Sequence, residues 1–169
     1  MMTDEEIKEK LQLYFKLDQA GNISIENGLV SCTGTLFLMR RQKVTELPVQ
    51  FKRVGQSFWC QHNKLTTLAG APESVHGDFV CNGNQLTSLA GAPRYVGKDF
   101  WLTYAKNLAL LPLLKIQSCQ RILFFNAYNN IEHESLSEIL NRYLGKGTRG
   151  MLSCAMEMIK AGYGSNARL

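Results

Sequence analysis

The chain has 169 residues, 45% of them hydrophobic, and a formal charge of +5 at pH 7. This size and apolar content allow one buried core and exclude an intrinsically disordered chain. The acidic start at residues 3–6 and the lack of a long apolar run exclude a secretory signal peptide and a membrane-spanning helix, so we expect a cytoplasmic protein with no membrane partner.

The five cysteines are odd in number and form no Cys-x-x-Cys pair. Such a set is typical of reduced thiols packed as small apolar side chains. We therefore expect neither a metal site nor a cofactor. The modest positive charge is scattered and favours, at most, a partner with an acidic surface.

The first segment predicts a helix followed by a hairpin. Thr3 and Glu6 have the spacing of a capping box, and apolar residues at helical spacing extend the expected helix over 4–17. Asn27-Gly28 separates two short β-prone runs and predicts a tight hairpin turn. We expect residues 1–34 to cap the exposed end of the array of repeats that follows.

Residues 44–105 contain one 21-residue pattern three times, in copies that begin at Val44, Leu65 and Leu86. A period in the low twenties predicts a solenoid in which each unit adds one strand and one turn. A single unit cannot bury its own apolar side, so the units must stack.

Within a copy, the spacing assigns a place to each side chain. Strand alternation directs Phe79 and Cys81 into the core. The amide of Asn84, at the following bend, is expected to bond backbone groups that leave the strand, and Asn63 occupies the same column. The third copy has Ala105 there instead.

The array extends beyond the three clear copies. Counting back one repeat length predicts an earlier strand with Phe37 and Met39 in the core. Counting forward, with one inserted residue, predicts a fifth strand with Ile122 and Phe124 in the core. Residues 35–130 are thus expected to hold about five rungs.

Helical spacing returns after the array. It predicts one helix over 135–143 and, after a glycine-rich break at 145–147, a second helix. The expected apolar side of the second helix consists of Met151, Leu152, Ala155, Met158 and Ile159. Residues 131–169 would then cap the other end. The fold class is α/β, a short solenoid between two caps.

The repeat also resembles known sequences. The pattern Phe-x-Cys-x-x-Asn-x-Leu-x-x-Leu is similar to a leucine-rich repeat with Phe and Cys replacing leucines. The form Leu-Thr-Ser-Leu-x-Gly-Ala-Pro-x-x-Val-Gly-x-Asp-Phe, from Leu86 to Phe100, and the tail Asn166-Ala167-Arg168 resemble small leucine-rich-repeat proteins of tailed bacteriophages. This resemblance implies a phage protein in the cytoplasm of an infected bacterium and implies no biochemical activity.

If the Phe and Cys columns face inward, the residues between them face solvent. That outward column is entirely apolar, which solvent contact alone does not favour. Its members are Leu38, Trp59, Val80, Trp101 and Leu123. At the usual strand spacing they form a stripe roughly 19 Å long, and tryptophans are frequent binding anchors. The stripe is therefore the predicted partner-binding face.

Mixed polar residues are expected to flank the stripe as a rim. The candidates are Arg40, Arg41, His62 and Tyr104. The alternatives for the stripe are burial under the protein's own caps and a homodimer through the face of Trp59 and Trp101.

Three functions follow from these patterns. The first is a non-enzymatic protein that binds a host protein and inhibits a host defence enzyme or toxin, where the host role comes from the phage resemblance alone. The second is single-stranded nucleic-acid binding, with aromatic rings stacking on bases and basic residues at phosphates. Its residues would be Trp59, Trp101, Tyr104, Arg40, Arg41, Lys52 and Arg53.

The third and weakest function is an enzyme that uses Asp78 and Asp99. These residues are expected in adjacent rungs, and paired carboxylates can perform acid and base chemistry. Arg121 is expected in the next rung, however, which favours an ion-pair ladder.

Overall fold

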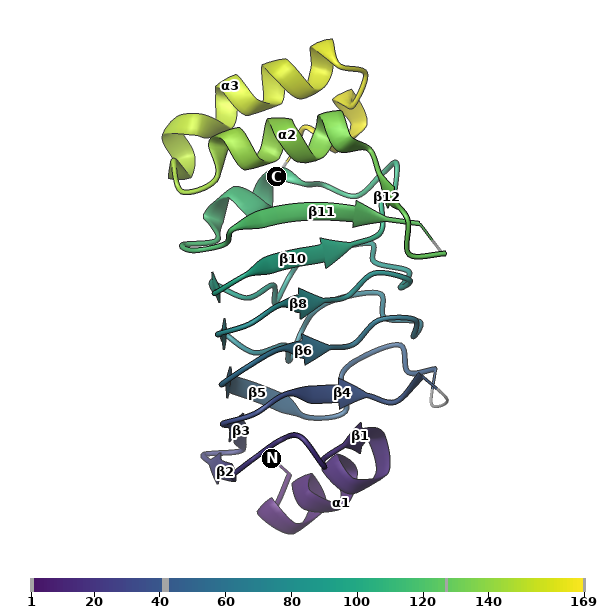
Figure 1. Cartoon of the computed structure of the whole chain (residues 1–169), viewed down its shortest axis with the longest axis vertical. Helices are drawn as coiled ribbons and strands as arrows, with labels where there is room; N and C mark the ends of the chain where they lie inside the picture. The colour runs from purple at the N-terminus through teal and green to yellow at the C-terminus, as the bar shows by residue number, and fades with distance from the viewer. Residues whose placement is uncertain (1, 41–42, 127, 169) are drawn as a thin grey trace.

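The computed structural model describes residues 2–40, 43–126 and 128–168 (Figure 1). The chain winds as a β-solenoid of about four turns, in which equivalent residues of the central repeats are 21 positions apart, as the sequence predicts. Helix α1 (Asp4–Tyr14) lies at one end of the long axis, and helices α2 (Glu134–Tyr143) and α3 (Gly147–Lys160) lie at the other.

One face of the solenoid is a seven-stranded sheet, and its five central strands are parallel. These are β4 (Leu36–Leu38), β6 (Phe58–Trp59), β8 (Phe79–Val80), β10 (Asp99–Leu102) and β11 (Arg121–Phe125). Two short antiparallel strands, β1 (Phe15–Lys16) and β12 (Ile131–Glu132), complete the sheet at its two ends. The fifth strand is in the predicted register, with Ile122 and Phe124 in the core.

The opposite face is a second sheet, whereas the repeat pattern predicted one strand per unit. Its strands are β2 (Ile23–Glu26), β3 (Leu29–Cys32), β5 (Gln50–Val54), β7 (Ser74–Val75) and β9 (Tyr95–Val96). The additional strand in each turn is a consequence of the repeat. An extended segment that recurs in every turn lies beside its own copies, and their backbone groups can pair.

The Phe and Cys columns form the core, as predicted. The fully buried rings of Phe58, Phe79 and Phe100 stack along the solenoid, with centroids 5.7 and 4.9 Å apart. Cys60 and Cys81 are also fully buried. Successive turns are therefore joined through one continuous column of aromatic side chains.

Asn84 bonds the bend after its strand, as predicted, whereas the Oδ1 of Asn63, in the same column, has no partner among the described residues. Asn84 Nδ2 donates to the carbonyls of Cys60 (3.0 Å) and Cys81 (2.8 Å), and its Oδ1 accepts from the backbone N–H of Leu65 (3.0 Å). These bonds connect one turn to the next. Where the third copy has Ala105, Asn166 from the C-terminal tail donates to the carbonyl of residue 105 instead (2.9 Å).

At the N-terminal end the capping box is confirmed. The Thr3 Oγ1 accepts from the Glu6 N–H (3.2 Å), and Glu6 Oε2 accepts from the Thr3 N–H (2.7 Å). The helix ends at Tyr14 rather than at the predicted residue 17, because Phe15 pairs with Leu38 as a strand and its ring packs into the core. The hairpin of β2 and β3 is confirmed, with Asn27 and Gly28 at positive φ as a two-residue turn requires.

The register predicted for the first strand is wrong by one residue. Leu36 pairs with Phe58 and Phe37 with Trp59, so this turn is 22 residues long. Leu36 and Leu38 therefore enter the core, while Phe37 and Met39 are only partly buried. A shift of one residue exchanges the two faces of a strand.

The C-terminal helices close the sheet beyond β11. Asn141 of α2 accepts from the Ile122 N–H (2.7 Å) and donates to the Ile122 carbonyl (3.3 Å), so its amide takes the place of a further strand. Two 3-10 helices, η2 (Leu111–Lys115) and η3 (Gly164–Asn166), complete this end. Within the described residues, no helix is both long and apolar enough to cross a membrane.

The apolar side predicted for α3 is partly wrong. Cys154 and Met158 face the core, but Leu152 and Ile159 are 72% and 59% exposed. The helix packs on α2 and η2 with Cys154 and Met158 toward the core, and Leu152, Met156 and Ile159 lie on its opposite side.

Candidate partner-binding face

Five residues form the outward column on the parallel strands of the seven-stranded sheet. The pairing of neighbouring strands places these residues side by side, in the order Phe37, Trp59, Val80, Trp101 and Leu123. Four of these are the predicted ones. The prediction of Leu38 is wrong, because the first turn has one residue more than the repeat length. Leu38 is 3% exposed and lies in the core, as does Phe15, the residue with which it pairs on β1.

Four rings form two stacked pairs on this face, which we call the aromatic ladder: Phe37, Trp59, Trp101 and the buried Phe125. Phe37 stacks on Trp59 with centroids 5.7 Å apart, and Trp101 stacks on Phe125 at 4.5 Å. The two indoles meet at 6.2 Å, although their strands lie roughly 9.6 Å apart at normal strand spacing. They therefore lean toward each other.

Val80 lies between the two tryptophans in the register, and its side chain is fully buried. Its outward orientation matches the prediction, but the indoles cover it. Val80 thus supports the rings and cannot itself touch a partner. The tryptophans and Leu123 remain partly exposed, and the helical caps lie at the ends of the sheet stack rather than over this face (Figure 1).

A hollow of about 320 Å³ opens at the N-terminal end of the aromatic ladder. Its walls are Lys16, Phe37, Leu38, Met39, Arg40, Trp59 and Gln61. Two rings and two aliphatic side chains give it an apolar floor, and Lys16 and Arg40 give it a cationic rim. Such a recess suits an apolar side chain with an anionic neighbour.

The rim residue His62 is tied to a loop from the far end of the sheet. Its Nε2 lies 3.2 Å from the Asn129 Oδ1, which also accepts from Nδ2 of the buried Asn82 (2.9 Å). Burial, and then the nearby Arg40, lower the pKa of His62. A side chain at Gly83 would meet the His62 ring at 2.4 Å, so this position requires glycine.

Tyr104 does not lie on the rim. Its ring packs on His133 at 3.9 Å and its hydroxyl donates to the Asn166 Oδ1 (3.2 Å), so it belongs to the C-terminal cap. The prediction for Tyr104 assumes that strand alternation continues past Leu102, but β10 ends at Leu102 and the chain then turns. Arg40 is exposed as predicted, and Arg41 lies outside the described residues.

The predicted ion-pair ladder of Asp78, Asp99 and Arg121 is confirmed in part: Asp99 and Arg121 form an ion pair, and Asp78 joins them through hydrogen bonds. The Arg121 guanidinium pairs with both carboxylate oxygens of Asp99, at 2.6 and 3.2 Å, and this hydrogen bonding raises the pKa of Arg121. Asp78 Oδ1 accepts from the backbone N–H of Asp99 (3.2 Å), and its Oδ2 lies 3.5 Å from the hydroxyl of Ser57. These carboxylates hold neighbouring strands together.

Two of the basic residues predicted to meet phosphates do not lie near the tryptophans. Lys52 and Arg53 lie on β5, in the opposite sheet, where Lys52 is 4.0 Å from Glu26 and Arg53 is 3.3 Å from His76. Among the described residues, no group of three or more His, Cys, Asp or Glu side chains could hold a metal ion.

The cysteines are unpaired and protected. Burial raises the pKa of all five thiols, to about 11 for Cys119 and Cys154. At pH 8 a thiol with that pKa is about one-thousandth thiolate, against about a quarter for a free cysteine. We expect slow reaction of the native protein with Ellman's reagent, led by the partly exposed Cys119, and reaction of all five thiols in guanidinium. A fast-reacting thiol in the native protein that persists in Cys119→Ser would contradict this assignment.

The sequence interpretation missed Phe37 as a member of the outward column and did not predict that the buried ring of Phe125 stacks on Trp101. A usable signal for Phe37 is the pair of aliphatic residues Leu36 and Leu38 on either side of it, which alternation directs to the core. No family model, curated protein or solved structure matches this chain, so its function has to be inferred from its own residues.

Proposed function

We propose that the protein is a non-enzymatic binding protein that holds a partner protein on the aromatic ladder. The observation that carries this proposal is the row of four rings, two stacked pairs whose indoles meet at 6.2 Å, on an outward sheet face with both tryptophans partly exposed. A monomer that binds nothing gains little by presenting two tryptophans to water.

The ladder has the physical properties of an anchor site. Its rings support one another and rest on Val80, so binding costs little side-chain entropy. The hollow beside Trp59 offers a recess for a partner side chain, and Lys16, Arg40 and Gln61 supply polar groups around it. An apolar centre with a polar rim is the usual anatomy of a protein interface.

The phage resemblance supports a more specific version. We infer that the partner is a bacterial host protein in the cytoplasm, and that the chain inhibits a defence enzyme or toxin by occupying its surface. A non-enzymatic role agrees with the ion-pair ladder, because the oxygens of Asp78 and Asp99 already contact strand neighbours.

Nucleic-acid binding is the second candidate, favoured by the cationic rim that Lys16 and Arg40 give the hollow beside two stacked rings. It is weaker because Lys52 and Arg53 lie on the opposite sheet. Binding to phosphates would weaken steeply as salt rises from about 50 to 200 mM, whereas binding through apolar rings would not.

The test uses the fact that the chain has two tryptophans, both on the proposed face. A partner isolated with the tagged protein from bacterial cells is purified and titrated while tryptophan fluorescence is recorded. We expect a fluorescence change that persists at 200 mM salt. Because Trp59→Ala/Trp101→Ala has no tryptophan left to report binding, its affinity is measured by isothermal titration calorimetry beside the wild type, and a loss of about 30-fold or more is expected.

Tyr95→Ala is the matched control, since Tyr95 is an exposed aromatic residue on the opposite sheet. It should bind the partner as the wild type does. Retention of the partner by the tryptophan double variant would overturn the proposal. Fluorescence quenching by an oligothymidylate that disappears at 200 mM salt, without a protein partner, would favour the second candidate.

A further inference from the structure

The outer side of helix α3 carries an exposed apolar stripe, which we call the α3 stripe: Leu152, Met156 and Ile159. Their side chains are 72%, 51% and 59% exposed, and their spacing places them on one face of the helix. Arg149 and Lys160 are exposed and share this face by the same spacing. The terminal unit of a solenoid normally has a polar outer face, so this stripe is expected to be covered.

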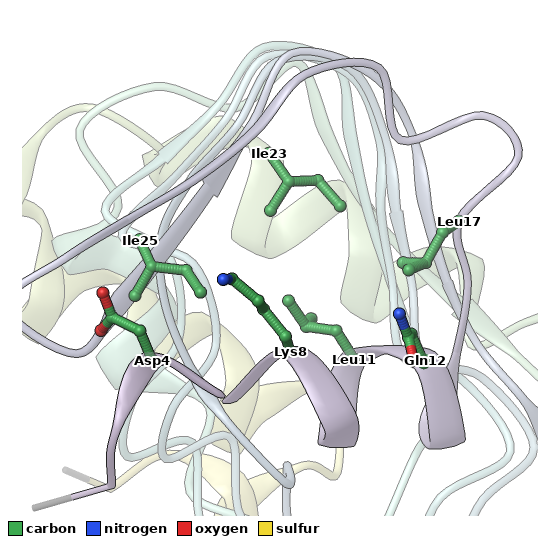
Figure 2. A pocket seen from close by; sticks show the side chains of 7 residues that line it. All are labelled: Asp4, Lys8, Leu11, Gln12, Leu17, Ile23 and Ile25. Carbon is green, nitrogen blue, oxygen red and sulfur yellow. The ribbon is translucent and has the colours of Figure 1, made fainter. Parts of the chain in front are cut away.

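The other end of the molecule has a complementary depression between α1 and β2, which we call the N-terminal hollow (Figure 2). It measures about 410 Å³ and is lined by Asp4, Lys8, Leu11, Gln12, Leu17, Ile23 and Ile25. Figure 2 shows Ile23 and Ile25 facing the side chains of Lys8 and Leu11 across it. The hollow therefore has apolar walls formed by Leu11, Ile23 and Ile25, and two charged residues, Asp4 and Lys8, also line it.

The net charges that flank the two surfaces are opposite. Lys8 in the hollow pairs with Glu5 at 3.2 Å, so residues 4–8 keep a net negative charge, whereas Arg149 and Lys160 flank the stripe. The first turn of α1 is acidic, with Asp4, Glu5 and Glu6, and the last turn of that helix has no basic residue. The first turn of α3 has no acidic residue, and its last turn carries Lys160. Apolar centres with opposite flanking charges are complementary in the way that contacting protein surfaces are.

The two surfaces lie at opposite ends of the long axis, so they cannot meet within one chain (Figure 1). We propose that the α3 stripe of one copy docks in the N-terminal hollow of a second copy, which produces head-to-tail association. Such a contact is heterologous, and without ring closure it extends to further copies. It uses neither the aromatic ladder nor the partner proposed above.

The interface is small, so an affinity on the order of micromolar is expected. In sedimentation velocity, the average mass of the wild type should rise with concentration past that of a dimer. Leu152→Ser/Met156→Ser alters the stripe, and Ile23→Lys or Gln12→Arg alters the hollow. Each should weaken association by about tenfold or more, while Tyr128→Ser, an exposed residue outside both surfaces, should not.

Mixing a stripe variant with a hollow variant distinguishes head-to-tail docking from other modes of self-association. A stripe variant retains its hollow and a hollow variant retains its stripe, so a 1:1 mixture should form dimers that grow no further. Gln12→Arg changes only an exposed margin, which guards against loss of folding, and circular dichroism checks each variant. A wild type that stays monomeric, hollow variants that associate as the wild type does, or a mixture without dimers would each overturn the proposal.

Discussion

Replacing Phe79 by alanine is expected to lower the free energy of unfolding by about 3–5 kcal/mol. The ring is fully buried between Phe58 and Phe100, at centroid distances of 5.7 and 4.9 Å. Its removal leaves a cavity that separates two turns of the solenoid from each other. Since the free energy of unfolding of a domain is only ~5–15 kcal/mol, this variant would lose much of its stability. Urea unfolding followed by circular dichroism measures the change.

Phe79→Leu is the control, because it keeps most of the apolar volume at the same position and should cost clearly less. A solenoid transmits stability through contacts between neighbouring turns, so the alanine variant should weaken the whole array. A loss below about 1 kcal/mol for alanine would mean that the phenylalanine column does not hold the turns together.

Replacing Asn166 by alanine is expected to destabilise the C-terminal end by about 2–5 kcal/mol, since several buried polar groups lose their partners together. The Asn166 side chain is fully buried and donates to the carbonyls of Ala105 (2.9 Å) and Leu108 (2.8 Å). It also accepts from the hydroxyl of Tyr104 (3.2 Å). Hydrogen exchange of the backbone amides around residues 105–110 locates the loss, and chemical unfolding gives its size.

Asn166→Asp tests whether the N–H donors of the Asn166 amide, rather than its acceptor oxygen, provide the stability. It retains an oxygen for Tyr104 but loses both N–H donors, so it should be nearly as unstable as the alanine variant. Ser165→Ala provides the control in the neighbouring position, because Ser165 is exposed and bonds only the Lys106 carbonyl (2.6 Å). Equal stability of Asn166→Asp and the wild type would contradict the proposed donor role.

The solenoid was predictable because its information is local and repeated. Three copies of one pattern identify the inward Phe and Cys columns and the asparagine at the bend, and the structure confirms all three at Phe79, Cys81 and Asn84. The capping box and the hairpin turn at Asn27-Gly28 are equally local. In each case the interaction joins residues close in sequence or in equivalent positions of adjacent copies.

The candidate site was predictable only in part, for the same reason. Alternation correctly directs Trp59, Val80 and Trp101 outward, since β6, β8 and β10 keep the 21-residue spacing. It fails at Leu38, because one additional residue in the first turn moves Phe37 to the outward face. It also fails at Tyr104, which follows the end of its strand.

The sequence by itself determined the repeat length, the inward columns and the presence of a cap at each end, since these depend on spacing along the chain. Only the tertiary structure decided that the indoles lean toward each other over Val80 and that the buried Asn166 amide bonds the carbonyls of Ala105 and Leu108. It also decided that α3 turns Leu152 and Ile159 toward solvent. These features join segments far apart in the chain or depend on how rings and helices pack, and neither is set by a local pattern.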